Sequence, residues 1–309
     1  MNKIALSVKN LNKVYLNSNK SKNKNALKNV DIDVFQGEIF GLLGPNGAGK
    51  TTFLNILGGT VAKTSGKINV WGFDLDKNPR QVRASIGIVP QEINLDAFFS
   101  PKKLLDLQAG LYGVSKKDRI TETILKMVSL ENQADSYARS LSGGMKRRLL
   151  IAKAMVHQPP ILVLDEPTAG VDVELRRNLW TNVKELNKEG VTVILTTHYL
   201  FEAQEMCDRI AIINKGNLVA LDSTQKLLER IQTKKIIFKV KNTKNINKLK
   251  SESFSFSINS ENTISVTYEK NLHKFNEILD IFNENGIEIL DILTNDGDLE
   301  DVFVQITKN

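Results

Sequence analysis

A glycine-rich octapeptide, GPNGAGKT at residues 44–51, carries the clearest chemical pattern in this sequence of 309 residues. It fits the phosphate-binding pattern G-x-x-x-x-G-K-[ST], and it lies between a strand-like run and a helix-like run, as that pattern requires. Glycines let backbone N–H groups curl around phosphate oxygens at the start of a helix, where the helix dipole also favours anions. In such a loop Lys50 reaches the β- and γ-phosphates of a nucleotide, and Thr51 ligates Mg²⁺. The residues expected to bind nucleotide in this segment are Gly44, Pro45, Asn46, Gly47, Ala48, Gly49, Lys50, Thr51 and Thr52.

Two adjacent acids, Asp165 and Glu166, end the apolar run ILVLDE at residues 161–166. Acids are common where any strand enters a loop, so the pair has meaning only beside the phosphate loop. Beside a phosphate loop, Asp165 is expected to hold Mg²⁺, directly or through a water. Glu166, one residue nearer the nucleotide, is expected to act as general base on the attacking water.

The elements that must hold these residues alternate along the first 230 residues, where short apolar runs are followed by longer helical patterns. Such alternation predicts an α/β fold with a mainly parallel sheet wrapped by helices. The runs GEIFGLL at 37–43, ILVLD at 161–165 and VTVILTT at 191–197 are typical of central, fully buried strands. Apolar residues at three- and four-residue spacing predict a helical insert over about 95–157.

The composition shifts toward Asn, Ser and Lys after the helical run LLERI at 227–231. Strand-like and helix-like runs then follow, which predicts a small α+β domain over 232–309 beside a first domain over 1–231. The polar stretch NSNKSKNKN at 17–25 is expected to be an exposed loop.

The whole chain has a net charge of +7, and its first 231 residues carry +9, because acidic side chains outnumber basic ones by two from Gln232 onward. No basic stripe is interleaved with aromatic residues, so a nucleic-acid partner is not expected. No run approaches the roughly 20 apolar residues of a membrane helix, and the opening residues are too weakly apolar for a secretion signal. The single cysteine, Cys207, fits a reducing compartment, and the chain is expected to stay in the cytoplasm.

The segment LSGGM at residues 141–145, about twenty residues before Asp165, resembles the signature motif of the ABC ATPases. In that family the motif opens a helix whose N-terminus faces the γ-phosphate held by a second subunit. The resemblance therefore implies that Ser142, Gly143 and Gly144 complete the site of a partner. It implies ATP and Mg²⁺ as the bound groups, and a head-to-tail dimer with a second copy or a related ATPase.

Four further positions match the same family pattern in order. Gln91 resembles the glutamine that joins the nucleotide site to the helical insert and senses Mg²⁺ and water. Asp172 resembles the aspartate of the loop that crosses the dimer interface, and His198 resembles the switch histidine that contacts the γ-phosphate. Tyr15 resembles the aromatic residue that stacks on adenine, although a packed strand residue is the alternative. The resemblance thus implies Glu166, His198, Gln91 and Lys50 as catalytic residues, and Thr51, Gln91 and Asp165 as metal ligands.

Three segments are similar to the branch of the family that exports drugs, antibiotics and polysaccharides. They are MKRR at 145–148, the stretch from Val89 to Val114, and LEDVF at 299–303 near the end of the chain. The resemblance implies an ATP-hydrolysing subunit that drives a separate membrane permease from the inner face of the cell membrane. Candidate permease contacts are Leu95, Phe98 and Phe99, which would otherwise cover the local core.

Two other functions are alternatives to this one. A non-transport ABC ATPase would act on ribosomes or nucleic acid, but ribosome-acting relatives usually carry two nucleotide domains, and relatives that act on DNA ends insert a long coiled coil. This chain has one set of motifs and no heptad array. A ligand-binding sensor in residues 232–309 would need a clustered site, so this segment is expected to be a structural or dimer-supporting module.

Overall fold

The computed structural model describes residues 3–16, 23–170, 173–241, 253–260, 262–269, 271–295 and 297–307. The chain forms two compact units, Met1–Ser223 and Thr224–Asn309. Helix α8, Thr224–Glu229, belongs to the second unit, and the domain boundary predicted between residues 231 and 232 stays a prediction.

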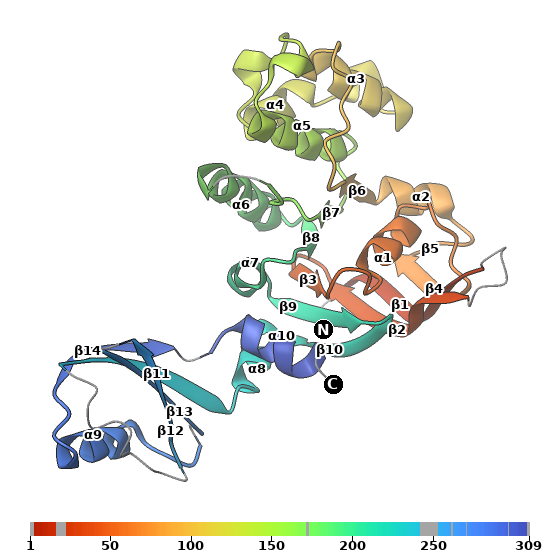
Figure 1. Ribbon diagram of the computed structural model, residues 1–309. Coiled ribbons are helices and arrows are strands. Elements are labelled where there is room, and N and C mark those ends of the chain that lie inside the picture. The colour runs from red at the N-terminus through yellow and green to blue at the C-terminus, as the bar shows by residue number, and fades with distance from the viewer. Residues whose placement is uncertain are drawn as a thin grey trace. The chain divides into compact units, whose positions relative to one another are not determined.

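A six-stranded, mostly parallel sheet forms the centre of the first unit (Figure 1). Its strands, in spatial order, are β10 (Asn217–Ser223), β9 (Arg209–Asn214), β3 (Ile39–Leu43), β8 (Thr192–Thr196), β7 (Ile161–Asp165) and β6 (Ile86–Val89). Five of them run parallel, and β10 returns antiparallel to β9. Every residue of β3 and β8 is buried, which confirms the central strands predicted from their continuous apolar runs. The carboxyl ends of the parallel strands meet at one edge, where ligands bind in open α/β sheets.

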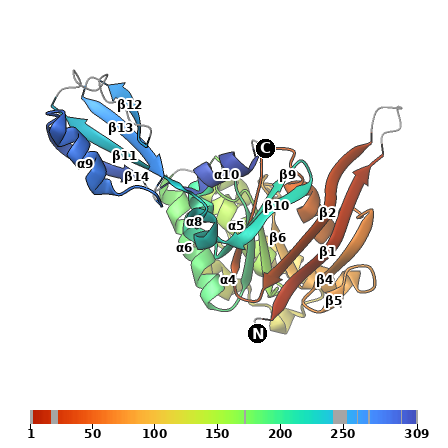
Figure 2. The ribbon, with the colours of Figure 1, turned by 90° about the horizontal axis from the view of Figure 1, so that it is seen from below.

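A second sheet, antiparallel and four-stranded, was not predicted from the sequence. Its order is β2 (Lys24–Phe35), β1 (Ile4–Tyr15), β4 (Ser65–Val70) and β5 (Phe73–Asp74). Figure 2 shows β1, β2 and β4 side by side in this layer. The expected loop over 17–25 is wrong at its end, because Lys24 and Asn25 already pair with Tyr15 and Val14 of β1; residues 17–22 lie outside the described part of the chain.

The helices of the first unit fall into two groups. One group precedes or follows strands of the central sheet: α1 (Lys50–Leu57), α6 (Val173–Lys188) and α7 (Leu200–Met206) follow β3, β7 and β8, and α2 (Pro79–Ala84) precedes β6. The other is the helical insert, with α3 (Pro101–Leu111), α4 (Thr121–Met127) and α5 (Gly143–Met155), and Figure 1 shows these three as one cluster beyond β6 and β7. Three short 3-10 turns connect them, Lys116–Asp118, Glu131–Gln133 and Ala138–Ser140. Ser100 caps α3 through its hydroxyl and Pro101 opens the helix, so the insert starts close to its predicted limit.

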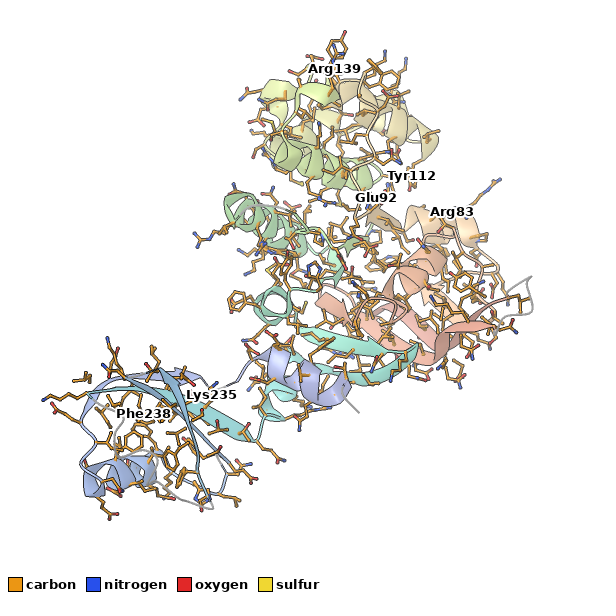
Figure 3. The ribbon with its side chains drawn as sticks, viewed as in Figure 1. Arg83, Glu92, Tyr112, Arg139, Lys235 and Phe238 are labelled. Atoms are coloured by element: carbon orange, nitrogen blue, oxygen red, sulfur yellow. The ribbon has the colours of Figure 1, made fainter. Side chains whose placement is uncertain are left out.

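The second unit is an antiparallel sheet with helices, in the spatial order β12-β13-β11-β14. Its elements are α8, β11 (Thr233–Val240), β12 (Ser255–Ser260), β13 (Thr263–Glu269), α9 (Phe275–Glu284), β14 (Ile289–Asn295) and α10 (Leu299–Thr307). Phe238 and Phe282 are fully buried and meet edge to face, with ring centroids 4.8 Å apart. Figure 3 shows Phe238 of β11 between the sheet and α9, where this unit has its own core.

Candidate nucleotide-binding site

A cleft of about 540 Å³ opens at the carboxyl edge of the parallel sheet. It is lined by residues from the phosphate loop, β1, β2 and the ends of three central strands: Tyr15, Lys24, Ala26, Asn46, Gly47, Ala48, Gly49, Lys50, Thr51, Thr52, Gln91, Glu166 and His198. Most of the residues predicted to bind or process a nucleotide therefore meet in one place.

The phosphate loop needs glycine for steric reasons, as Gly47 and Gly49 illustrate. Gly47 has a φ of +78°, in the left-handed region that side chains with a Cβ rarely adopt. At Gly49 a Cβ would lie 2.5 Å from the carbonyl oxygen of Ala26, which is too close for any other residue. The loop then enters α1 at Lys50, so backbone N–H groups at the start of this helix face the cleft.

Lys50 is buried, and its ammonium donates hydrogen bonds to the carbonyl oxygens of Gly44 at 2.6 Å and Pro45 at 3.4 Å. Burial lowers the pKa of Lys50, while the nearby carboxylates of Glu166 and Asp165 act in the opposite direction. The positive charge is thus held inside the loop, where it can pair with phosphate oxygens.

Asp165 is the last residue of β7, and a side chain of the neighbouring strand holds it in place. The hydroxyl of Thr196, at the end of β8, donates to Asp165 Oδ1 at 2.6 Å. Burial raises the pKa of Asp165, and this hydrogen bond partly offsets the effect. Asp165 does not line the main cleft but an adjoining cavity of about 450 Å³.

Two side chains contact the same carboxylate oxygen of Glu166. Gln91 Nε2 donates to Glu166 Oε2 at 3.0 Å, and His198 Nδ1 lies 3.2 Å from that oxygen. The backbone N–H of Glu166 donates to both the carbonyl oxygen and the hydroxyl of Thr196, each at 3.1 Å. Glu166 has a φ of +44°, a backbone conformation that costs free energy in a residue with a side chain and is often found at functional sites. Segments after β6, β7 and β8 therefore converge on one carboxylate.

Tyr15 lies at the mouth of the cleft with 38% of its surface exposed, and Lys13 Nζ lies 4.7 Å from its ring centroid. An exposed aromatic face here can stack on a flat base. The signature residues lie elsewhere: among the described residues that line the cleft, none belongs to 141–145. Ser142 instead caps α5, where its hydroxyl accepts a hydrogen bond from the N–H of Met145 at 3.3 Å. Asp172 lies outside the described residues.

The chemistry of the site fits Mg²⁺. The expected ligands are the hydroxyl of Thr51, the amide oxygen of Gln91 and the carboxylate of Asp165, all oxygen donors of the type that Mg²⁺ prefers. Within the described part of the chain, no group of three His, Cys, Asp or Glu side chains could hold a metal ion.

Three residues of the site were missed in the sequence. Lys24 and Ala26 line the cleft from β2, and nothing in the polar stretch before them signals this position. Thr196 supports both acids, and its signal was visible, because it is a hydroxyl inside the apolar run VTVILTT.

Comparisons with known proteins agree with this geometry. The profile of the ABC transporter family matches residues 27–169. The chain is 40% identical over 211 residues to a linearmycin resistance ATP-binding protein of Bacillus subtilis, covering 67% of this chain and 68% of that protein. It is 38% identical over 231 residues to a Nod factor export ATP-binding protein of Rhizobium sp., covering 74% of each. Among solved structures, a dimeric ATP-binding cassette in a post-hydrolysis state with ADP and Pi matches at a TM-score of 0.62 and 28% identity. That match covers 71% of this chain and 98% of the cassette.

Proposed function

This chain belongs to the ABC transporter family as an ATP-binding subunit, and we propose that it powers an exporter by ATP-dependent pairing of two such subunits. As a member of this family it binds ATP and Mg²⁺ and hydrolyses ATP. The proposal concerns the residues that act, the paired assembly, the membrane partner and the direction of transport.

The convergence of Gln91 and His198 on Glu166 Oε2 is the observation that carries the proposal. Glu166 accepts the proton of the attacking water, because its carboxylate lies in the same cleft as the phosphate loop. His198 contacts the γ-phosphate and Gln91 orients the water and the metal. Lys50 binds the β- and γ-phosphates through its buried ammonium. Thr51, Gln91 and Asp165 would hold Mg²⁺, which would supply positive charge to offset the charge that develops on the phosphates.

The signature motif supports a composite site. Ser142 begins a helix of 13 residues, whose N-terminal N–H groups and dipole favour an anion, yet it lies outside the cleft of its own chain. In a head-to-tail pair, Ser142, Gly143 and Gly144 of one copy face the γ-phosphate bound by the other. The similar cassette bound to ADP and Pi is dimeric, which supports a paired assembly.

The membrane partner follows from family membership and from one exposed surface. Among the described residues, no helix is both long enough and apolar enough to span a membrane. Phe98 is 71% exposed, while Leu95 and Phe99 are half-buried, so Phe98 is the strongest candidate for a contact with the permease. The subunit then works at the inner face of the cell membrane.

Export is supported by the names of the relatives, which act in linearmycin resistance and in Nod factor export. Their sequence similarity extends over about two thirds or more of this chain. The C-terminal unit has its own core and ends in helix α10, and it is a structural or dimer-supporting module in this proposal.

Light scattering coupled to size-exclusion chromatography tests the proposal on the Glu166→Gln variant, which should trap bound ATP. We expect ATP with Mg²⁺ to shift the molar mass from that of one chain to that of two. The same protein with Ser142→Arg added should stay monomeric with ATP. A Glu166→Gln protein that binds ATP and stays monomeric would contradict ATP-dependent pairing of this subunit.

A further inference from the structure

Arg147 is an arginine with an unusual environment. It lies on α5, five positions after the helix cap Ser142, and is only 4% exposed. Its Nη1 donates to the carbonyl oxygens of Pro90 at 3.0 Å and Gln91 at 2.8 Å. Within the described residues no carboxylate forms an ion pair with it, and its buried Nε has no hydrogen-bond partner. The guanidinium is therefore held by the backbone of the Gln91 segment.

Burying a guanidinium without a carboxylate is costly. Burial lowers the pKa of Arg147, as expected for a charge taken out of water. The neighbours Leu149 and Leu150 on the same helix are buried and apolar, so packing of α5 alone gives no reason for a charged residue here. The favourable interaction that an arginine provides at this position is its pair of charge-assisted hydrogen bonds to two adjacent carbonyl oxygens.

Helix α5 is in turn seated on the central sheet. A Cβ at Gly87 of β6 would lie 2.3 Å from the carbonyl oxygen of Ala154, so the last turns of α5 rest directly on the β6 backbone. The first turn of the same helix carries Ser142. One rigid element thus joins the signature residues, Arg147 and the strand that leads into Gln91.

The far end of the Gln91 segment is tied to the same part of the chain. The N–H groups of Ala138 and Arg139, just before α5, donate to the carbonyl oxygens of Phe99 at 2.9 Å and Ala97 at 3.1 Å. Figure 3 shows Arg139 at the outer end of the helical insert and Glu92, next to Gln91, near the strands. The segment is therefore held at both ends by residues on or beside the signature helix.

We propose that Arg147 is a positioning residue that couples the signature helix to Gln91, and through Gln91 to Glu166. The proposal rests on the proposed roles of Gln91 and Glu166. When a nucleotide on the partner moves Ser142, α5 moves with it, and Arg147 carries that displacement to the backbone of Gln91. The amide of Gln91 then reaches Glu166 Oε2 only while α5 holds the position described above.

Arg148 is a matched control on the next position of the helix. Its Nη1 also donates to two adjacent carbonyl oxygens, those of Val128 at 2.7 Å and Ser129 at 3.0 Å. These lie at the end of α4, inside the helical insert and away from Gln91. Both arginines therefore make the same type of contact, but only Arg147 reaches the catalytic segment.

The test compares Arg147→Met and Arg148→Met in the full chain, by steady-state ATP hydrolysis and by hydrogen–deuterium exchange of the amides of residues 91–99. We expect Arg147→Met to lower kcat by about 10- to 100-fold with KM for ATP within about twofold, because a catalytic group is misplaced while binding is kept. Exchange at 91–99 should rise. Arg148→Met should raise exchange near residues 121–130 and keep kcat within about twofold of the parent chain.

Wild-type kcat or unchanged exchange at 91–99 in Arg147→Met would overturn the proposal, as would equal losses of kcat in both variants. Arg147→Lys keeps the positive charge but loses the guanidinium that donates to both carbonyl oxygens, so it should recover only part of kcat. Full recovery of kcat would mean that the charge alone is needed. Glu166→Gln is measured in parallel. If it keeps turnover, the proposed role of Glu166 fails, and that failure is distinct from a failure of the link through Arg147.

Discussion

Gln91 Nε2 and Glu166 Oε2 lie 3.0 Å apart, although the two residues are 75 positions apart in the chain. Gln91 comes from the segment that leads into the helical insert, and Glu166 follows the central strand β7. A shift of the insert therefore changes the hydrogen bonding of the proposed base. This contact links the part of the subunit that would meet a permease to the residue that would act on ATP.

Replacing Glu166 by glutamine tests the base. We expect Glu166→Gln to lower kcat for ATP hydrolysis by at least about 100-fold, because the amide cannot take a proton from water. ATP affinity, measured by isothermal titration calorimetry, should change by less than about threefold, since the phosphate loop is untouched. Turnover close to that of the parent chain would refute the assignment of the base.

Replacing Lys50 tests the phosphate loop. Lys50→Ala removes a buried ammonium that is expected to pair with phosphates, so ATP binding should weaken by about 10- to 100-fold, the range given by charged hydrogen bonds of ~1.5–3 kcal/mol. Lys24→Ala is the control, because Lys24 lines the same cleft from β2 but is exposed. Unchanged ATP affinity in Lys50→Ala, or equal losses in both variants, would count against the phosphate-loop assignment.

Replacing Tyr15 tests the adenine contact. Stacking of a base on an aromatic side chain is worth ~1–3 kcal/mol, and Tyr15 is partly exposed, so Tyr15→Ala should weaken ATP binding by about five- to tenfold. Tyr15→Phe keeps the flat face and should bind ATP like the parent chain. If the alanine and phenylalanine variants bind ATP equally well, Tyr15 is a packed strand residue without a part in recognition.

The raised pKa of Asp165 predicts that its charged carboxylate destabilises the fold, although hydrolysis needs this residue. The folded chain holds a proton on Asp165 more tightly than the unfolded chain, whose aspartate titrates near the ordinary pKa of 3.8. The free energy of unfolding therefore falls as pH rises from that value through the higher folded pKa, and the cost of the buried charge persists at pH 7. Asp165→Asn should raise Tm at pH 7 by about 2 °C, as expected for a gain of about 1 kcal/mol in a domain of this size, and should abolish hydrolysis.

The control for this experiment is Asp135→Asn, which removes an exposed carboxylate of the helical insert. Its Tm should match that of the parent chain at pH 7. A lower Tm for Asp165→Asn at pH 7, measured without nucleotide, would mean that the charge of Asp165 stabilises the fold.

Much of the site could be predicted because its residues follow strands whose apolar character is visible locally. The phosphate loop, Glu166 and His198 each come directly after a buried strand, and parallel strands bring their carboxyl ends to one edge. Gln91 likewise follows β6. The positions of these residues after buried strands therefore predicted that they would lie close together at that edge.

The remaining parts depend on pairing between distant segments. The antiparallel sheet pairs β1 with β4 across more than fifty residues, and no local sequence pattern predicts that pairing. Lys24 reaches the cleft only because β2 pairs with β1. The sequence places Arg147 in the MKRR segment that resembles an exporter branch, whereas its contact with the Gln91 backbone depends on how α5 lies against β6.

The most direct measurement of the central claim, that two copies share each ATP site, mixes two inactive variants. Lys50→Ala disables the phosphate loop, and Ser142→Arg disables the signature residue that would serve the partner. Each variant alone should hydrolyse no ATP. In an equal mixture only a pair of unlike copies holds an intact site, one of its two. Hydrolysis should therefore return to about one quarter of the parent rate when pairs form at random, and to at most about one half when only unlike copies pair. A mixture as inactive as its two components would contradict the shared site.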